Sequence, residues 1–170
     1  MDYSLAKNYI TQHIELFGDE LYGMIDDSFI STSRNLDSFQ ESLDSFKASI
    51  ENCEKCNLSL TRNKFVFGSG DPNADLFLVG EGPGEEEDSK GEPFVGKAGK
   101  LLDKMLEAIK LNRKNVYISN VVNFRPPMNR RPTDEEIKRY LPFLVKHIEL
   151  INPKILLLLG STAVSYTHLT

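Results

Sequence analysis

The amino-acid sequence predicts an α/β fold with a short parallel sheet, and two observations lead to this prediction. Three short, almost fully apolar runs, at residues 75–80, 115–122 and 153–160, have the composition of strands buried on both faces. Amphipathic segments at residues 96–111 and 133–151 separate these runs. Strands and helices that alternate in this order are typical of right-handed crossovers between parallel strands.

The first fifty residues predict a helical extension that is distinct from the α/β domain. Apolar residues recur at helical spacing in residues 3–25 and 36–50, and a Ser- and Asp-rich linker separates the two segments. Residues 1–50 carry 9 acidic and 3 basic side chains. We therefore expect an acidic extension that docks on a protein partner or on the following domain, which we place at residues 51–164.

The two helices of the α/β domain have recognisable signals at their ends and along one face. The segment 96–111 predicts a helix whose inward-facing residues are Leu101, Leu102, Met105, Leu106 and Ile109. Thr133 and Glu136 form a T-x-x-E capping box at the start of the second helix. Pro142 lies inside that helix and predicts a kink or a break, because proline lacks the amide hydrogen of the helical ladder. Ser161 predicts the N-cap of a further helix.

The overall composition is that of a soluble, cytoplasmic domain, and we expect a monomer that does not associate with a membrane. Hydrophobic residues make up 40% of the chain, and no apolar run is long enough to span a bilayer. The N-terminus lacks the basic and apolar regions of a signal peptide. The net charge is −5, yet residues 113–139 hold 7 basic and 3 acidic side chains, so a local basic face is available for phosphates.

In parallel α/β sheets, ligands bind at the carboxyl ends of the strands. The predicted strand ends fall at residues 80–84, 120–125 and 160–162. The first of these loops contains G-x-G-x-G, where the acidic Glu81 would repel the pyrophosphate of a dinucleotide. The loop is therefore either a tight acidic turn or a catalytic loop whose carboxylate stabilises a developing cation or orients a water, as in glycosidic bond cleavage.

Two further residues near these strand ends have both a structural and a functional interpretation. Phe94, in "PFVG", is either a core residue or a platform on which a planar base stacks. Asn120 ends the second apolar strand, and its amide either binds loop backbone or reads the O4 and N3–H edge of uracil.

The segment "RPPMNRRP" that follows is basic and stiffened by prolines. It is either a solvated loop or a contact surface for DNA phosphates. The residues that we expect to contact DNA are Arg125, Asn129, Arg130 and Arg131.

Four stretches in this order, GEGPGEEED, PFVGKAGKLLD, YISNVVNFRPPMNRRPT and ILLLLGSTA, resemble the family 4 uracil-DNA glycosylases, the iron–sulfur type. The resemblance runs from about Cys53 to Val164. It implies the three-layer α/β/α fold of that superfamily, here without its last strand. It also implies a DNA-repair hydrolase that acts on uracil-containing DNA and releases uracil by base flipping.

The resemblance also implies a role for each matching residue. Glu81 and Glu87 would be the catalytic acids, with Glu81 assisting the water or the developing cation. Gly82 would present backbone beside the flipped base. Phe94 would stack on uracil, and Asn120 would read its edge and discriminate against cytosine.

The family holds a 4Fe–4S cluster through four cysteines, and this chain departs from that pattern. Cys53 and Cys56 match the first pair, but the other two positions are Phe124 and Tyr140. Two thiolates are a poor site for a four-iron cluster, so we predict that no stable cluster forms and that the two aromatic rings pack in its place. The C-x-x-C would then be a pair of small apolar residues, or a zinc or redox site.

A second departure concerns the C-terminal side of the chain. The family has a histidine motif beyond a further strand, and His168 lacks the context of that motif. We do not assign His168 this role, and we expect residues 165–170 to be a non-native tail. The alternatives to a glycosylase are a non-catalytic DNA-binding or polymerase-associated module and, with less support, a nucleotide-binding protein.

Overall fold

The structure is a computed structural model that describes residues 36–51, 63–161 and 163. The predicted helix at 3–25, the cysteine pair Cys53 and Cys56, and His168 lie outside the described residues. The side chains of the first helix are described from Leu43 onward.

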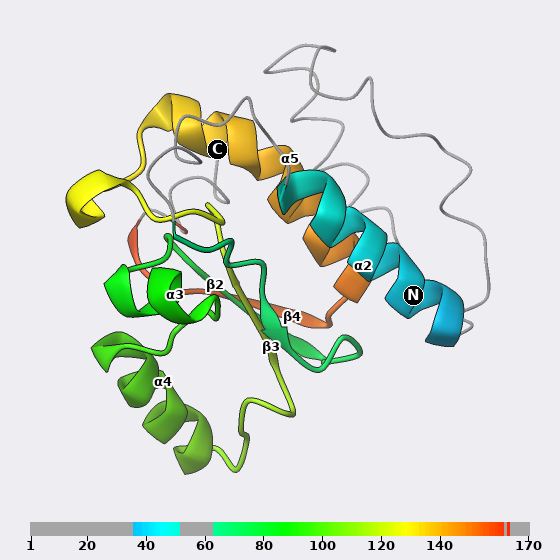
Figure 1. Cartoon of the computed structure of the whole chain (residues 1–170). Coiled ribbons are helices and arrows are strands. Elements are labelled where there is room, and N and C mark those ends of the chain that lie inside the picture. The colour runs from blue at the N-terminus through cyan, green and yellow to red at the C-terminus, as the bar shows by residue number, and fades with distance from the viewer. Residues whose placement is uncertain (1–35, 52–62, 162, 164–170) are drawn as a thin grey trace. The chain divides into compact units, whose positions relative to one another are not determined.

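The described part of the chain forms a four-stranded sheet in the order β1-β3-β2-β4 (Figure 1). β2 (Leu76–Gly80) lies at the centre and pairs in parallel with β3 (Tyr117–Asn120) and with β4 (Ile155–Leu158). These three strands confirm the predicted parallel sheet. β1 (Ser69–Gly70) pairs antiparallel with β3 and makes the sheet mixed, and its two residues are too few to give a sequence pattern.

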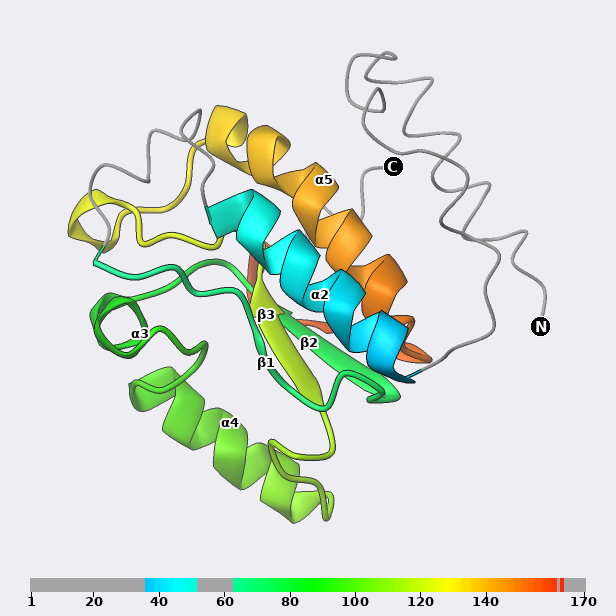
Figure 2. The ribbon, with the colours of Figure 1, turned by 45° about the vertical axis from the view of Figure 1, so that its right-hand side comes forward.

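Helices cover both faces of the sheet and form the three layers that were expected (Figure 2). α2 (Leu36–Glu51) and α5 (Asp134–Ile151) lie side by side on one face. α4 (Lys97–Ala108) lies on the other face, beside the short helix α3 (Glu85–Lys90). The sequence analysis did not predict α3. Four acidic residues in its first turn favour this helix, because they interact with the positive end of its dipole.

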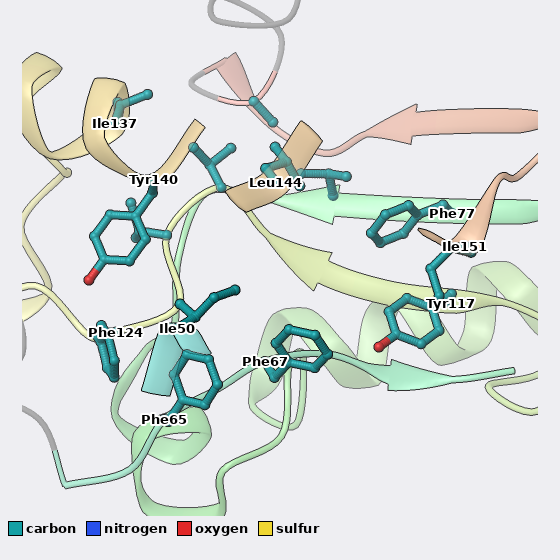
Figure 3. Close-up of a cluster of buried hydrophobic side chains, with 14 of the residues drawn as sticks. Ile50, Phe65, Phe67, Phe77, Tyr117, Phe124, Ile137, Tyr140, Leu144 and Ile151 are labelled. Atoms are coloured by element: carbon teal, nitrogen blue, oxygen red, sulfur yellow. The ribbon is translucent and has the colours of Figure 1, made fainter. Parts of the chain in front are cut away.

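The two faces of the sheet have different cores. On the side of α2 and α5 the core is large and aromatic (Figure 3), and it includes Phe65, Phe67, Phe77, Tyr117, Phe124 and Tyr140. On the side of α4 the core is small and aliphatic, and it consists of Leu78, Leu102, Leu106, Val116 and Ile118. Phe94 packs against this second cluster.

The structure decides two details of the predicted helices. α5 runs through Pro142 without a break, because packing of its apolar face outweighs the hydrogen bond that proline removes, and the kink stays a prediction. On α4 only Leu102 and Leu106 of the five predicted inward residues are buried, while the side chains of Leu101, Met105 and Ile109 are exposed. The second cluster is too small to cover a wider stripe of this helix.

Among the described residues β4 is an edge strand of the sheet, and its apolar residues Ile155, Leu156 and Leu157 are also exposed. No helix in the part of the chain that the structure describes is long and apolar enough to cross a bilayer.

Candidate active site

Two predicted site residues, Phe94 and Asn120, meet beside Gly80 at the carboxyl ends of β2 and β3. Gly80 and Asn120 are direct neighbours in the register of the two strands. A Cβ atom on Gly80 would lie 2.5 Å from a ring carbon of Phe94 and 2.6 Å from Oδ1 of Asn120. Only glycine therefore allows the ring and the amide to approach the end of β2 this closely.

The side chain of Asn120 is buried and leaves one of its hydrogen-bonding groups without a partner among the described residues. It is 3% exposed, and its amide nitrogen has no hydrogen-bond partner among the described residues. A buried amide donor without a partner is costly, so such a group calls for an explanation. A ligand that presents an acceptor to this nitrogen is one explanation that the geometry permits.

Phe94 has an unusual backbone conformation for a bulky residue, with φ of 55°. Its ring is half-buried, since it packs on the aliphatic cluster and borders Gly80. The two interpretations offered for this residue are therefore compatible. The ring packs on the core cluster, and its outer edge lies next to Gly80 at the strand ends.

The carboxylate of Glu87 is engaged with the backbone of two loops. Oε2 accepts a hydrogen bond from the amide of Gly84 at 3.1 Å, which caps α3. Oε1 accepts hydrogen bonds from the amides of Val95 at 2.9 Å and Gly96 at 2.8 Å. Glu87 therefore ties the glycine loop after β2 to the loop that carries Phe94, and this geometry is that of a positioning group.

Glu81 lies in a different setting, half-buried at the edge of a small cleft of about 120 Å³. The cleft lies between the glycine loop and the basic loop, and its lining consists of Glu81, Gly82, Pro83, Gly84, Pro126, Asn129, Arg130 and Pro132. A Cβ atom on Gly82 would lie 2.7 Å from a methyl group of Val122, so the glycine permits the close packing of the two loops. The cleft is large enough for a water or a small polar group beside the carboxylate.

The basic loop after β3 is partly neutralised by its own contacts. Nε of Arg125 donates to Oδ1 of Asn129 at 2.7 Å, and its Nη2 lies 3.7 Å from the carboxylate of Glu85. Both Nη atoms of Arg130 bind the carboxylate of Glu136, at 2.7 and 2.6 Å. This pair holds the pKa of Glu136 below its ordinary value. Arg131 is exposed, and its guanidinium has no hydrogen-bond or ion-pair partner in the part of the chain that the structure describes.

Several polar residues that support the site were not singled out from the sequence. Asp88 is fully buried and accepts hydrogen bonds from the backbone and side chain of Asn63. Asn123 is buried, and its amide donates to the carbonyls of Val66 and Phe67. Arg113 binds the carbonyls of the loop that carries Phe94. The only signal for Asn123 and Asp88 was a polar residue next to an apolar run or a helix, which is too common to identify such a contact.

Phe124 and Tyr140, the residues at the other two cluster positions, are part of the aromatic core (Figure 3). Both are essentially fully buried, and their ring centroids are 6.0 Å apart in an edge-to-face arrangement. Neither side chain offers a thiolate, so the residues present here do not fit a cluster that needs four. Among the described residues, no group of three or more His, Cys, Asp or Glu side chains could hold a metal ion.

His147 lies in the same aromatic core and is a structural histidine. Its ring stacks on Phe67 with centroids 4.1 Å apart, and Nε2 lies 3.0 Å from the hydroxyl of Tyr117. Burial lowers the pKa of His147 to about 3, so the ring is neutral at physiological pH. Burial also raises the pKa of the Tyr117 hydroxyl.

Comparison with known proteins identifies relatives of this chain. The family model of the uracil DNA glycosylase superfamily matches residues 67–169. The chain is 48% identical to the type-4 uracil-DNA glycosylase of Archaeoglobus fulgidus over 126 aligned residues. The aligned segment covers 74% of this chain and 63% of the relative. It is 48% identical over 117 residues to the type-4 uracil-DNA glycosylase of Thermotoga maritima, covering 69% of this chain and 61% of the relative.

A third relative has a different name. A DNA polymerase of Bacillus phage SP01 is 33% identical over 104 residues, which is 61% of this chain and 11% of the polymerase. The chain spans about three fifths of the length of the two glycosylases, at 63% and 61%.

Proposed function

Because the chain belongs to the uracil-DNA glycosylase superfamily, we propose that the protein hydrolyses the N-glycosidic bond of deoxyuridine in DNA and releases uracil. The observation that carries this proposal is the buried amide nitrogen of Asn120, which has no hydrogen-bond partner among the described residues. The amide oxygen of the same side chain and the ring of Phe94 both border Gly80. A flipped base could reach this position from the carboxyl ends of the strands.

The Asn120 amide would select uracil through its hydrogen-bonding pattern. Its nitrogen would donate to O4, and its oxygen would accept from N3–H. Cytosine presents an amino group and an unprotonated nitrogen at the same two positions, so it would leave both groups of the amide opposed by like groups. The ring of Phe94 would stack on the base and hold it in the plane of the amide.

Glu81 would act at the sugar. When the bond between C1′ and N1 breaks, its electron pair leaves with uracil, and positive charge develops on the sugar. The carboxylate of Glu81, at the edge of the cleft, would stabilise this charge or orient the water that adds to C1′. For Glu87 we propose a positioning role, because its two oxygens already accept hydrogen bonds from three backbone amides.

The DNA backbone would lie against the basic loop after β3. Arg131 is the strongest candidate for a phosphate contact, because its side chain is exposed and forms no ion pair among the described residues. Arg125, Asn129 and Arg130 would have to exchange their present partners for phosphate oxygens.

We also propose that the protein folds around its aromatic core without a 4Fe–4S cluster. The support is the burial of Phe124 and Tyr140 at positions that would have to supply thiolates. Iron and sulfide analysis after anaerobic purification tests this proposal. A stoichiometric content of four irons would contradict it.

The activity is tested by incubating the chain with a single-stranded oligonucleotide that contains one deoxyuridine, followed by alkaline cleavage of abasic sites. We expect uracil release that is lost in Asn120→Ala, with Asn115→Ala, an exposed asparagine before β3, as the matched control. Release that persists in Asn120→Ala would contradict the proposed base recognition.

The similarity to a phage DNA polymerase supports a second candidate, a DNA-binding module without catalytic activity. This candidate predicts binding of uracil-containing DNA, with a preference that depends on Asn120, and no release of uracil. A binding assay by fluorescence anisotropy, run beside the cleavage assay, separates the two functions.

A further inference from the structure

The conformation of Phe94 has to be imposed by its surroundings. A positive φ is unfavourable for a bulky side chain and persists only where neighbouring contacts fix it. The ring must also keep its place beside Gly80 and Asn120 if a base is to stack on it. The contacts that hold the backbone of residues 93–96 therefore decide where the ring lies.

Arg113 supplies one half of these contacts. It lies in the loop between α4 and β3, and its Nη1 donates to the carbonyl of Pro93 at 3.0 Å. Its Nη2 donates to the carbonyl of Phe94 itself. Nε donates to Oδ1 of Asp103, on α4, at 2.7 Å, and this ion pair orients the guanidinium. The side chain of Arg113 is 30% exposed, so these hydrogen bonds are partly shielded from water.

The other half comes from Glu87 and from α4. Glu87 accepts hydrogen bonds from the next two amides, those of Val95 and Gly96. The carbonyl of Phe94 points at Gly99, where any side chain would collide with it. The carbonyls of Pro93 and Phe94 thus bind the guanidinium of Arg113, and the amides of Val95 and Gly96 bind the carboxylate of Glu87. The backbone is therefore held on both sides of the peptide bond that follows Phe94.

We propose that Arg113 is a positioning residue for base binding, which fixes the ring of Phe94 over the site that Asn120 completes. This proposal rests on the proposed function. The planar guanidinium can bind two carbonyls and a carboxylate at once, whereas the single ammonium of a lysine cannot match this geometry. Arg113 is not placed to contact the base, so its effect is transmitted through the backbone of Pro93 and Phe94.

The absence of tryptophan from the chain provides a direct test. Phe94→Trp places a single tryptophan at the site, which can be excited selectively over the six tyrosines, and its quenching by free uracil reports stacking. In this background we expect Arg113→Gln to weaken uracil binding by roughly tenfold, as the loss of a charge-assisted hydrogen bond would. Arg113→Lys should restore this binding only in part, and Asp103→Asn should weaken it by roughly threefold. Lys104→Gln, an exposed neighbour of Asp103 on α4, is the matched control and should have no effect.

Two readouts separate positioning from a general structural role. In the absence of uracil, Arg113→Gln should lower the fluorescence anisotropy of the tryptophan at a temperature where circular dichroism shows the variant fully folded. In the otherwise unchanged chain, it should also accelerate hydrogen exchange at the amides of Val95 and Gly96. Affinity for DNA without uracil should not change.

Unchanged anisotropy and unchanged hydrogen exchange in Arg113→Gln would overturn the proposal, even if the affinity for uracil fell. An equal loss of uracil binding and of DNA binding would also overturn it, because it would indicate a general structural role. If uracil does not quench the tryptophan of the Phe94→Trp chain, the result contradicts the proposed stacking of uracil on residue 94. The anisotropy and exchange measurements then still decide whether Arg113 holds the ring.

Discussion

The loops that follow β2 and β3 each lead into a helix whose third residue is a glutamate that accepts a hydrogen bond from the backbone amide of the N-cap residue. Glu87 is the third residue of α3 and reaches back to the amide of Gly84. Glu136 is the third residue of α5 and reaches back to the amide of Thr133 at 2.7 Å. Beyond the cap, Glu87 binds two further backbone amides, whereas Glu136 binds the guanidinium of Arg130.

This difference separates two kinds of loop. Glu87 ties the glycine loop after β2 to the loop that carries Phe94 through backbone amides, so the position of Phe94 depends on a few hydrogen bonds to peptide groups. The loop after β3 is fixed by side-chain ion pairs, which can exchange partners when a phosphate approaches. A site that must hold a base rigidly and follow a flexible DNA strand needs both kinds of loop.

The largest effect is expected when the backbone-bound glutamate is removed. Glu87→Ala leaves the amides of Gly84, Val95 and Gly96 without an acceptor, and we expect the free energy of unfolding to fall by about 2–4 kcal/mol. Urea denaturation measures this loss. Glu86→Ala, on the same helix with an exposed side chain, is the control and should change stability by less than about 0.5 kcal/mol.

The second prediction concerns the loss of stability in acid. It compares Glu136, in the ion pair of the basic loop, with His147, in the buried core. The pKa of His147 is lowered to about 3 from 6.5, so the unfolded chain binds a proton first as the pH falls. Stability is therefore lost between about pH 6.5 and pH 3, by roughly 2–3 kcal/mol at pH 4.5. The pKa of Glu136 is also lowered, so its contribution is present above its unfolded value of 4.5 and is lost as the pH falls further.

Urea denaturation between pH 7 and pH 3.5 distinguishes the two groups. The stability curves of the parent chain and Glu136→Gln should run apart above about pH 5 and converge in acid, as carboxylate protonation removes the ion pair. In the double variant His147→Phe/Tyr117→Phe, which removes both partners of the buried hydrogen bond, the loss between pH 6.5 and pH 4.5 should shrink. A parent chain whose stability is constant over that range would contradict the buried, neutral state of His147.

The comparison of the two loops also shows what could be predicted from sequence. The parallel strands follow from short apolar runs and the helices α4 and α5 from hydrophobic periodicity, and the T-x-x-E box predicts the cap of α5. The N-cap residue of α3 is Gly84, which has no side chain to form a capping box, so the sequence carries no such signature there, and the resemblance implies a catalytic role for Glu87 instead. Whether Glu87 has that role stays a prediction, but its three backbone partners could not be deduced without the fold.

Partner choice is the other property that sequence could not supply. The basic loop predicted four residues available to phosphates, yet Arg130 lies against Glu136, six residues further along the chain. Asp103, Arg113 and Phe94 meet only because α4 folds back over the second core cluster. Both kinds of contact, between residues close in the sequence and between residues far apart in it, depend on the direction of the side chains. Composition and spacing do not specify this direction.

At the basic loop we expect a smaller effect, in which one substitution lowers the free energy of unfolding and raises the affinity for DNA. Glu136→Gln should lower the free energy of unfolding by about 1 kcal/mol, because the capping box loses its charge. It should also raise the affinity for DNA by up to roughly tenfold, since Arg130 is released for a phosphate and a negative charge is removed. Arg131→Gln should instead lower DNA affinity and reduce the salt slope by about 1, with little change in stability. Anisotropy titrations at two salt concentrations measure both variants, and weaker DNA binding by Glu136→Gln would contradict the idea that Glu136 sequesters Arg130.

The smallest effect is expected for the contact that joins the two loops, between Arg125 and Glu85. The charged atoms are 3.7 Å apart, and the side chain of Glu85 is 78% exposed, so solvent and salt screen the pair. Arg125→Ala should destabilise the protein more than Glu85→Ala, because the arginine side chain is only 20% exposed and also binds Asn129. A double-mutant cycle by urea denaturation should give a coupling energy below about 0.5 kcal/mol. A coupling energy above about 1 kcal/mol would show that the two loops form one rigid unit, and the basic loop could then not exchange its partners independently of the loop that holds Phe94.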